Sequence, residues 1–371
     1  MRRLALTAAL AVVVLAGFGG VGGAANSHAN AAAVCPAAEV GASHCHALVV
    51  TDAHGNPDAQ SSPYGLSPSQ IESAYNWSSI GSGAGKTIAI VDAYNDPTVA
   101  SDLQVFSQQY GIPCNGCLTV VNQSGGTRLP RTNSGWALEI SLDVQWAHAI
   151  APAASILLVE ASSNSNSNLY AAEDYAKQHA QYVSNSWGGS ESSGESAYDS
   201  HFKQAGVSFF VSAGDAGLPA EYPSASPNVI SVGGTTLTFN ANGTLASETG
   251  WADGGGGCSS YEAANAAQTS ASSFCNGRRA TPDVSLDADP ASGVSVYDST
   301  SYQGQRGWFK VGGTSASSPM WAARSAVLGS VVDASYVYGG HIAFRDITSG
   351  NNGAPCLVGF DLCTGLGSWV G

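Results

Sequence analysis

Five short runs decide the fold of this chain: KTIAIVD (residues 86–92), SILLVE (155–160), QYVS (181–184), VSFFVS (207–212) and VISV (229–232). Each run is apolar or rich in β-branched residues and is bounded by Gly, Pro or Asn, which is typical of buried strands. Segments of helical character separate the runs, at residues 99–110, 136–150, 169–180 and 197–204. This alternation predicts an α/β fold with a central, mostly parallel sheet and helices on both faces.

Residues 63–371 contain no internal repeat and no linker long enough to divide them, so we expect one large domain. Hydrophobic residues make up 44% of the chain and supply a substantial core, whereas only 11% of residues are charged. The formal net charge is −14. Because nucleic acids and anionic membranes are bound by basic patches, this composition disfavours both as partners. No exposed heptad or long apolar stripe indicates assembly, so a monomer is expected.

The first 33 residues have the pattern of a secretory signal peptide. Arg2 and Arg3 precede an apolar run over residues 4–18, and Gly/Ala-rich sequence continues to Ala33. The apolar run is shorter than the roughly 20 residues that a membrane span needs. Cys35 follows Val34 rather than a small residue, which argues against a lipid anchor. The sequence therefore predicts export, with no membrane anchor.

Eight cysteines in an exported chain favour disulfides. They fall into four pairs that are local in sequence, and we expect these pairs to be cross-linked: Cys35 with Cys45, Cys114 with Cys117, Cys258 with Cys275, and Cys356 with Cys363. A metal site at the second pair is the weaker interpretation, because no further soft ligands lie close in sequence. Spacing alone leaves the connectivity open.

The segment GTSASSP at residues 313–319 resembles a nucleophile elbow. A serine after Gly and Thr, followed by small residues and Pro319, suits a sharp turn into a helix. At such a turn Ser315 Oγ is expected to be exposed beside the unpaired N–H groups of the helix N-terminus. That position suits acyl transfer, provided that a base and an oxyanion donor lie nearby. The alternative is a Ser/Thr-rich loop that only caps a helix.

Two other segments are expected near Ser315. In open parallel sheets, sites form beyond the carboxyl ends of the strands. The run that ends near residue 184 leads into NSWGG (185–189), and the run that ends at residue 212 leads into AGDAG (213–217). Ser315 itself follows the apolar run at residues 308–311. We therefore expect these three segments to converge on one crevice.

Glu139 and Asp143 lie four residues apart in the predicted helix at 136–150, so they share one face of it. Apolar neighbours such as Ile140 and Val144 place the pair at the edge of a buried face. Two carboxyl groups in a partly desolvated site share a proton, and the pair loses its two protons at different pH values. The pair therefore indicates acid–base chemistry.

Taken together, these motifs resemble the sedolisin family, serine-carboxyl peptidases with a subtilisin-like fold. The matching segments are Glu139-Ile-Ser-Leu-Asp143-Val, Ser212-Ala-Gly-Asp215 and Gly313-Thr-Ser315-Ala-Ser-Ser-Pro319, in the order of the family. The segments at 64–75 and 344–350 also agree in character. The resemblance covers the chain from about residue 60 onward, and it implies a secreted, acid-active peptidase that cleaves proteins or peptides.

The resemblance implies a role for each of four residues. Ser315 attacks the peptide carbonyl, Glu139 takes the serine proton and passes it to the leaving amine, and Asp143 orients Glu139. Asp215 stands in the oxyanion hole, where it must be protonated to donate a hydrogen bond, which demands low pH or a raised pKa. Without the other motifs, Asp215 reads as a turn aspartate between glycines.

The resemblance also implies that Ser186, Trp187 and Gly188 form an extended edge that pairs with the substrate backbone. Pairing with an exposed edge is a general mode of peptide recognition. A purely structural role for Trp187 is the alternative, because aromatic side chains often belong to the core.

One structural calcium ion is a further implication of the resemblance. Its ligands are the carboxylates of Asp346 and Asp361 and the carbonyls of Ile347, Leu357 and Gly359. Oxygen ligands from a Gly-rich loop suit this hard cation. The loop between the two aspartates is shorter than is usual in the family, and Leu357 replaces a usual glycine; the alternative is a pair of turn aspartates.

The N-terminal region departs from the family pattern. Sedolisins usually carry a long folded prodomain, whereas residues 34–62 form only a short extension that we expect to be tied by Cys35 and Cys45. How activity is restrained therefore stays open at the level of sequence.

Two rival functions are weighed against this interpretation. A conventional Asp-His-Ser subtilase could pair Asp92 with Ser315, but residues 93–135 contain no histidine, and His148 lies at the far end of the acid-bearing helix. The three earlier histidines, His44, His46 and His54, are interpreted as surface residues. The second rival is a non-catalytic secreted binding protein with a Gly/Ser/Asn-rich surface.

Overall fold

The computed structural model describes residues 30–371 apart from residues 79 and 270. Its main sheet has the strand order β18-β19-β15-β11-β9-β7-β4-β6-β5, with β12 paired to β11. The strands from β19 to β5 run parallel to their neighbours, and only β18 and β12 are antiparallel. The bounds are Phe344–Arg345 for β18, Ser368–Trp369 for β19, Val284–Asp287 for β15, Ile230–Phe239 for β11, Ser208–Ser212 for β9, Tyr182–Asn185 for β7, Thr87–Ala93 for β4, Ser155–Ala161 for β6, Leu118–Asn122 for β5 and Leu245–Gly250 for β12.

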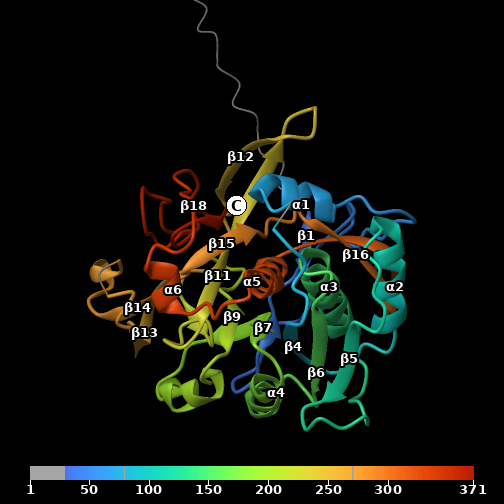
Figure 1. Cartoon of the computed structure of the whole chain (residues 1–371), viewed down its shortest axis with the longest axis horizontal. Helices are drawn as coiled ribbons and strands as arrows, with labels where there is room; N and C mark the ends of the chain where they lie inside the picture. Colours follow the sequence, from blue (N-terminus) through green and yellow to red (C-terminus); the bar gives the residue numbers. More distant parts are fainter. Residues whose placement is uncertain (1–29, 79, 270) are drawn as a thin grey trace, which may run out of the picture.

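Helices cover both faces of this sheet, so the predicted three-layer α/β class is confirmed (Figure 1). α3 and α5 pack against each other on one face, and α4 packs on β4 and β6 beside the 3₁₀ helix η1. The helices are α1 Pro68–Tyr75, α2 Val99–Tyr110, α3 Ser134–Ile150, α4 Asn166–His179, η1 Glu195–Phe202, η2 Ser273–Cys275, α5 Thr314–Leu328 and α6 Ala334–Tyr338. In the described part of the chain, no helix combines the length and the apolarity that crossing a membrane requires.

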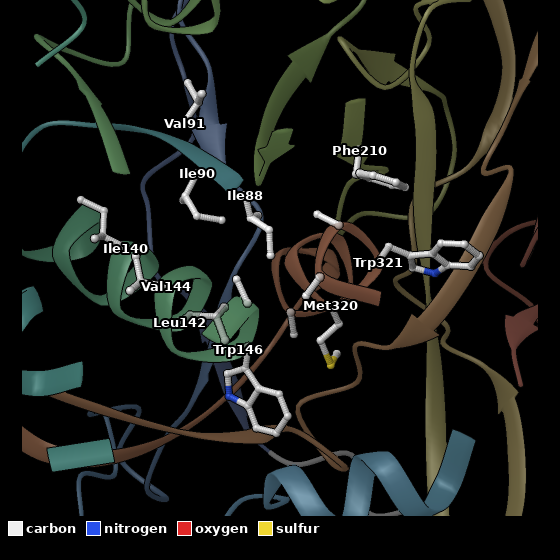
Figure 2. Packing of buried hydrophobic residues seen from close by; sticks show 14 of the residues in the cluster. Ile88, Ile90, Val91, Ile140, Leu142, Val144, Trp146, Phe210, Met320 and Trp321 are labelled. Atoms are coloured by element: carbon white, nitrogen blue, oxygen red, sulfur yellow. The ribbon is translucent and has the colours of Figure 1, made fainter. Parts of the chain in front are cut away.

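The core between β4, α3 and α5 places the first acidic side chain of the site. Figure 2 shows Ile88 and Ile90 of β4 close to the side chains of α3 and to α5. Because side chains alternate across a strand, Asp92 shares the face of these two isoleucines. β4 thus directs Asp92 toward α3, where Glu139 and Asp143 lie.

The run at residues 308–311 does not belong to the main sheet. It is part of β17 (Gln305–Gly312), which lies in a separate sheet of order β1-β3-β17-β16, with β1 at Ala31–Ala33, β3 at Leu48–Val50 and β16 at Val294–Tyr302. The antiparallel pairing of β16 with β17 forms this hairpin before the chain enters α5. Ser315 therefore reaches the site from a strand outside the main sheet.

The segment after the predicted signal peptide packs across the domain. β2 (His44–Cys45) pairs antiparallel with β8 (Trp187–Ser190), which also pairs with β10 (Glu221–Tyr222). β3 then pairs antiparallel with β17, and β1 pairs with β3. Most of the predicted signal peptide lies outside the described residues, and its last three residues form β1. The four predicted disulfides are present, one of them beside β14 (Arg278–Thr281) at Cys258 in β13 (Gly257–Ala263).

Candidate active site

Ser315 lies in the first turn of α5, two residues after Gly313. Gly313 has φ of 97°, a conformation that favours glycine, so the chain can turn sharply from β17 into the helix. Pro319 has no N–H to donate to the carbonyl of Ser315 four residues earlier. That carbonyl accepts a hydrogen bond from Ser186 Oγ instead, at 3.4 Å. The proline therefore leaves the first turn of α5 available for contacts with the segment after β7.

The Ser315 side chain is fully buried, so its predicted exposure is wrong. Its Oγ donates to the carbonyl oxygen of Ser186 at 3.2 Å, and its backbone N–H donates to the carbonyl oxygen of His46 at 2.9 Å. The cause of the burial is the segment around His46, which crosses directly in front of the helix N-terminus.

Glu139 and Asp143 are completely buried, deeper than the edge position predicted for them. α3 begins at a cap formed by Asn133, whose side chain accepts hydrogen bonds from Gly135 and Trp136, and almost its entire surface is buried. Burial, and then the neighbouring charges of Asp143 and Asp92, raise the pKa of Glu139 well above its usual range. Burial and the charge of Asp92 do the same to the pKa of Asp143.

Asp92 completes a cluster of three carboxyl groups. One oxygen of each of Asp92, Glu139 and Asp143 lies within 4.8 Å of the others. Burial raises the pKa of Asp92 to about 8. Both oxygens of each group lack a hydrogen-bond partner in the structure. Three adjacent buried carboxyls cannot all be ionised, so the cluster retains protons at neutral pH. The sequence indicated Asp92 only as a conventional triad partner.

Asp215 lies beside the first turn of α5. Its Oδ1 accepts hydrogen bonds from the Thr314 N–H at 2.7 Å and from Thr314 Oγ1 at 2.9 Å. Its Oδ2 is buried and has no partner. Burial raises the pKa of Asp215 to about 7, against the opposing effects of His46 and Thr314. Below that pH, the carboxyl is neutral and has one proton to donate.

Asp215 Oδ2 and the His46 carbonyl oxygen both lie next to Gly313. A Cβ on Gly313 would stand 2.5 Å from Asp215 Oδ2 and would collide with the His46 oxygen. The His46 carbonyl oxygen thus accepts from the Ser315 N–H and lies on the same side of Gly313 as Asp215 Oδ2, a placement compatible with an oxyanion hole.

The structure places the edge at Ser186, Trp187 and Gly188 next to Ser315. The backbone of Trp187 and Gly188 pairs with Cys45 and His44, and the carbonyl of Ser186 accepts from the His46 N–H at 3.1 Å. The Trp187 side chain is fully buried, and its Nε1 donates to the Val91 carbonyl at 2.8 Å. The backbone of this edge thus binds a peptide strand, while the Trp187 ring belongs to the core.

His46 is the residue of the site that the sequence interpretation missed, because it was assigned to the surface. It is 1% exposed, and His44 is half-buried, so the surface assignment is wrong for both and holds for His54. No signal in the sequence connects His46 with Ser315, since a separation of about 270 positions is bridged only by the fold.

These histidines do not form a conventional triad with Ser315. His46 Nδ1 lies 2.7 Å from Ser212 Oγ, and its Nε2 lies 3.0 Å from Glu221 Oε2, so both ring nitrogens have other partners. His148 contacts the Ile112 carbonyl at 2.9 Å, and burial lowers its pKa. Neither His46 nor His148 is therefore placed to act as the base of a conventional triad.

The two predicted carboxylate ligands of calcium, Asp346 and Asp361, lie close enough to interact in the C-terminal loop. Asp361 accepts hydrogen bonds from the N–H groups of Leu357, Cys363 and Thr364, and Asp346 Oδ2 accepts from the Gly359 N–H at 2.9 Å. Burial, and to a smaller extent the charge of Asp346, raise the pKa of Asp361. Two carboxyl groups close enough to interact, in a loop rich in backbone oxygens, fit the charge and the donor type that calcium prefers.

Comparisons with known proteins agree with this geometry. The model of the subtilase family matches residues 131–337, which is more than half of the chain. The chain is 30% identical to kumamolisin of Bacillus sp. (strain MN-32), over 86% of this chain and 65% of that protein. It is 29% identical to sedolisin of Pseudomonas sp. (strain 101), over 82% of this chain and 60% of that protein. The chain thus spans less than two thirds of the length of these curated relatives.

Solved structures give the same result. The Pseudomonas sedolisin, a serine-carboxyl proteinase complexed with two molecules of pseudo-iodotyrostatin, superimposes with a TM-score of 0.72 at 29% identity, over 83% of this chain and 96% of that chain. A cold-adapted subtilisin-like serine proteinase shares the fold with a TM-score of 0.51 at 16% identity, over 79% of this chain and 97% of that chain. The chain therefore belongs to the subtilase family and, within it, to the sedolisin group.

Proposed function

We propose that this protein is an exported, acid-active serine peptidase that cleaves peptide bonds in proteins or peptides through Ser315, Glu139, Asp143 and Asp215. One observation carries the proposal: a peptide carbonyl oxygen accepts from the Ser315 N–H and lies beside Gly313 together with Asp215 Oδ2, at the start of a helix that packs against α3. The family membership supports the class of reaction.

In this mechanism, Ser315 Oγ attacks the carbonyl carbon while Glu139 accepts the hydroxyl proton. The negative charge that develops on the carbonyl oxygen is stabilised by the Ser315 N–H and by the proton on Asp215. Glu139 then donates its proton to the leaving amine, and a water molecule hydrolyses the acyl-enzyme by the same steps in reverse. Glu139 can accept the serine proton only while the cluster that it forms with Asp143 and Asp92 carries a negative charge, and the three groups share the remaining protons.

Acid activity follows from the oxyanion hole. Asp215 donates a hydrogen bond only while it is protonated, and its pKa of about 7 keeps it protonated at acidic pH. A conventional subtilase needs a neutral histidine and loses activity in acid, whereas this set of residues needs a neutral aspartic acid and loses activity in alkali.

Export is part of the proposal. It is supported by the pattern of the first 33 residues and by four disulfides, which persist in oxidising compartments.

A single calcium ion at Asp346 and Asp361, with carbonyls of Ile347, Leu357 and Gly359, is also proposed, as a structural ion that ties the C-terminal loop. The acidic, charge-poor composition supports protein or peptide substrates rather than nucleic acid. A monomer is proposed.

The decisive experiment measures cleavage of a denatured protein across pH by Ser315→Ala and Glu139→Gln variants. We expect each variant to lose at least about 10³-fold in kcat/KM at about pH 4 while it still folds, because each removes a group that acts only in the transition state.

Two matched controls separate the chemistry from burial. Glu173 is also a fully buried glutamate with a pKa raised by burial, to about 8, but it lies on α4, away from Ser315. Ser325 is a buried serine on α5 without a hydrogen-bond partner. Glu173→Gln and Ser325→Ala should therefore keep activity near that of the parent. Parental activity in either of the two test variants would contradict the proposal.

A further inference from the structure

A segment of the chain itself lies in the peptide groove. On one side of His46, the strand β2 pairs antiparallel with β8, with His44 opposite Gly188 and Cys45 opposite Trp187. On the other side, β3 pairs antiparallel with β17, with Leu48 opposite Gly312. Backbone hydrogen bonds thus hold the segment on both sides of His46, as an added strand is held in β-augmentation.

The peptide bond between His46 and Ala47 is the one presented to Ser315. The His46 N–H donates to the Ser186 carbonyl at 3.1 Å, and the His46 carbonyl accepts from the Ser315 N–H at 2.9 Å. The Ala47 carbonyl accepts from the Val34 N–H at 2.9 Å, so the residue after this bond is also fixed. Because the Ser315 N–H binds the oxygen of His46, the carbonyl carbon of His46 is the carbon presented to Ser315.

The His46 ring fills a pocket whose polar groups match an imidazole. Ser212 Oγ lies 2.7 Å from Nδ1, and Glu221 Oε2 lies 3.0 Å from Nε2. The ring is fully buried, and the Glu221 side chain is only 16% exposed. Although burial opposes it, the charge of Glu221 raises the pKa of His46. His44 and Asp215 are the other titratable groups that interact with this pair.

We propose that Glu221 and Ser212 make this groove selective for a histidine directly before the cleaved bond, and that the His46–Ala47 bond of the chain itself is the first such substrate. This inference rests on the proposed peptidase function and names its substrate class. An aliphatic or phenyl side chain in the same pocket would leave Glu221 without a partner and Ser212 Oγ with only the Asn185 carbonyl, at 3.4 Å. Unpaired buried polar groups are costly.

The self-cleavage step consumes one water molecule. Ser315 Oγ bonds to the His46 carbonyl carbon, the bond from that carbon to the Ala47 nitrogen breaks, and the serine proton passes through Glu139 to the new Ala47 amine. Water then splits the ester, which returns the proton to Ser315 and leaves a carboxylate on His46.

Cleavage at this bond would open the groove. While residues 43–50 lie in it, Ser315 is buried and no other peptide can pair with β8. Cys35 and Cys45 both precede the bond and the other six cysteines follow it, so no disulfide crosses the cut. After the cut, only non-covalent pairing, such as that of β1 with β3, holds the N-terminal piece.

Self-cleavage is tested by mass spectrometry of the full chain and its Ser315→Ala variant, incubated at pH 4. We expect an N-terminus at Ala47 in the parent and an uncut bond in the variant. The rate should be independent of protein concentration, because the bond is already seated. Cleavage at this bond in the Ser315→Ala variant, or no cleavage there in an active parent, would overturn the inference.

Pocket selectivity is tested with synthetic peptides on the parent enzyme after acid incubation. The first peptide is residues 42–50 with Cys45→Ala, and the second carries His46→Phe in addition. We expect kcat/KM to favour the histidine peptide by at least about 10-fold. In Glu221→Gln, this ratio should fall to below about 3-fold.

The control variant is Glu191→Gln. Glu191 directly follows β8 and lies at the rim of the groove. It accepts hydrogen bonds from Ser259 Oγ and from the Ser260 N–H, not from His46. Glu191→Gln therefore removes one negative charge, as Glu221→Gln does, without touching the His46 ring. It should keep the parental preference. An equal loss in both variants, or no preference in the parent, would overturn the pocket assignment.

Failure of the inference and failure of the function are distinguishable. An enzyme that digests denatured protein at pH 4, but leaves the His46–Ala47 bond intact and shows no preference for histidine, retains the proposed function without this inference. An enzyme without acid-dependent hydrolysis of any protein or peptide contradicts the function itself.

Discussion

Asp215 illustrates how burial changes the chemistry that one side chain can perform. Its Oδ1 is occupied by two hydrogen bonds from Thr314, which leaves Oδ2 to carry the proton when the group is neutral. An exposed aspartate would be ionised above about pH 4 and would repel an oxyanion. Burial raises the pKa to about 7, so the same side chain is a donor throughout the acidic range.

Asp215→Asn should broaden the pH range of activity. In the parent, kcat/KM should fall as pH rises through about 7, because the proton on Asp215 is lost. An asparagine amide donates at every pH, so the variant should lose that alkaline limb while it keeps activity at pH 4 within about 100-fold of the parent. A pH–rate profile with a fluorogenic peptide measures both. An unchanged alkaline limb in the variant would assign that limb to another group.

At the scale of elements, the turn from β17 into α5 controls what approaches Ser315. Gly313 has φ of 97° and packs against the oxygen of His46. Its missing side chain is what lets a peptide backbone lie against the helix N-terminus. The hydroxyls of Ser317 and Ser318 fix the first turn of the helix to Gly233 and Ser184.

Gly313→Ala should abolish cleavage by blocking the carbonyl site. The added Cβ would stand 2.8 Å from the Ala47 Cα and 2.5 Å from Asp215 Oδ2, so we expect a loss of at least about 10²-fold in kcat/KM. Gly304→Ala is the matched control, because Gly304 has φ of 85° but open space around it. The two variants should share a modest drop in Tm, while only the first loses activity.

The loop between Asp346 and Asp361 provides a test at the same scale. If it binds calcium, chelation should lower the Tm, since an ion at about 100 times its Kd stabilises by about 2.7 kcal/mol. Asp361→Asn should abolish this dependence, whereas Asp253→Asn, at an exposed aspartate elsewhere, should retain it. Thermal scans with EDTA and with added Ca²⁺ make the measurement. A chelator effect that persists in Asp361→Asn would place the ion elsewhere.

Elements with strong local patterns were predictable from sequence. The helix at 99–110 has the predicted bounds, and the predicted strand at 155–160 extends by one residue to Ala161. β5 was missed because Leu118–Asn122 is half-buried and mixes Thr with Val. The run at 308–311 was recognised only as apolar, and its sheet was not predicted, because partners such as β3 lie far away in sequence. Local chemistry reveals an element, whereas its neighbours depend on the whole chain.

The same limit applies to the site. Glu139, Asp143, Asp215 and Ser315 stand in motifs that carry their chemistry in sequence. His46 and Glu221 carry no such motif, since each acquires its role from the other across the fold. Asp92 is an intermediate case. Its place at the end of β4 was predictable from the sequence, but its contact with the acids of α3 was not.

At the scale of the molecule, buried carboxyls dominate the response to pH. Burial raises the pKa of Asp92, Glu160, Glu173 and Asp298 to about 8. Below about pH 4 such groups are neutral in both the folded and the unfolded chain. Above that pH, the unfolded chain releases protons that the folded chain keeps, so each group lowers the free energy of unfolding by about 1.4 kcal/mol per pH unit until its folded pKa is reached.

The protein should therefore be more stable at pH 5 than at pH 8. Burial lowers the pKa of His44 to about 4 and also lowers that of His148, which costs stability below about pH 6.5, but these two groups are outnumbered by the carboxyls. We expect the Tm at pH 8 to be lower by at least about 5 °C. Calorimetry on the Ser315→Ala variant avoids self-digestion during the scan. Glu173→Gln should reduce the difference, and a Tm that rises from pH 5 to pH 8 would contradict the sign.

The four disulfides have a consequence for durability as well as for stability. They join cysteines 10, 3, 17 and 7 residues apart. Rings of this size stabilise by about 2 to 3 kcal/mol each, less than longer rings, since the entropic gain grows with the logarithm of ring size. A cut inside one of these rings, however, leaves both new ends covalently attached. In a medium that contains an active protease, a nicked surface loop would then stay in place instead of unravelling.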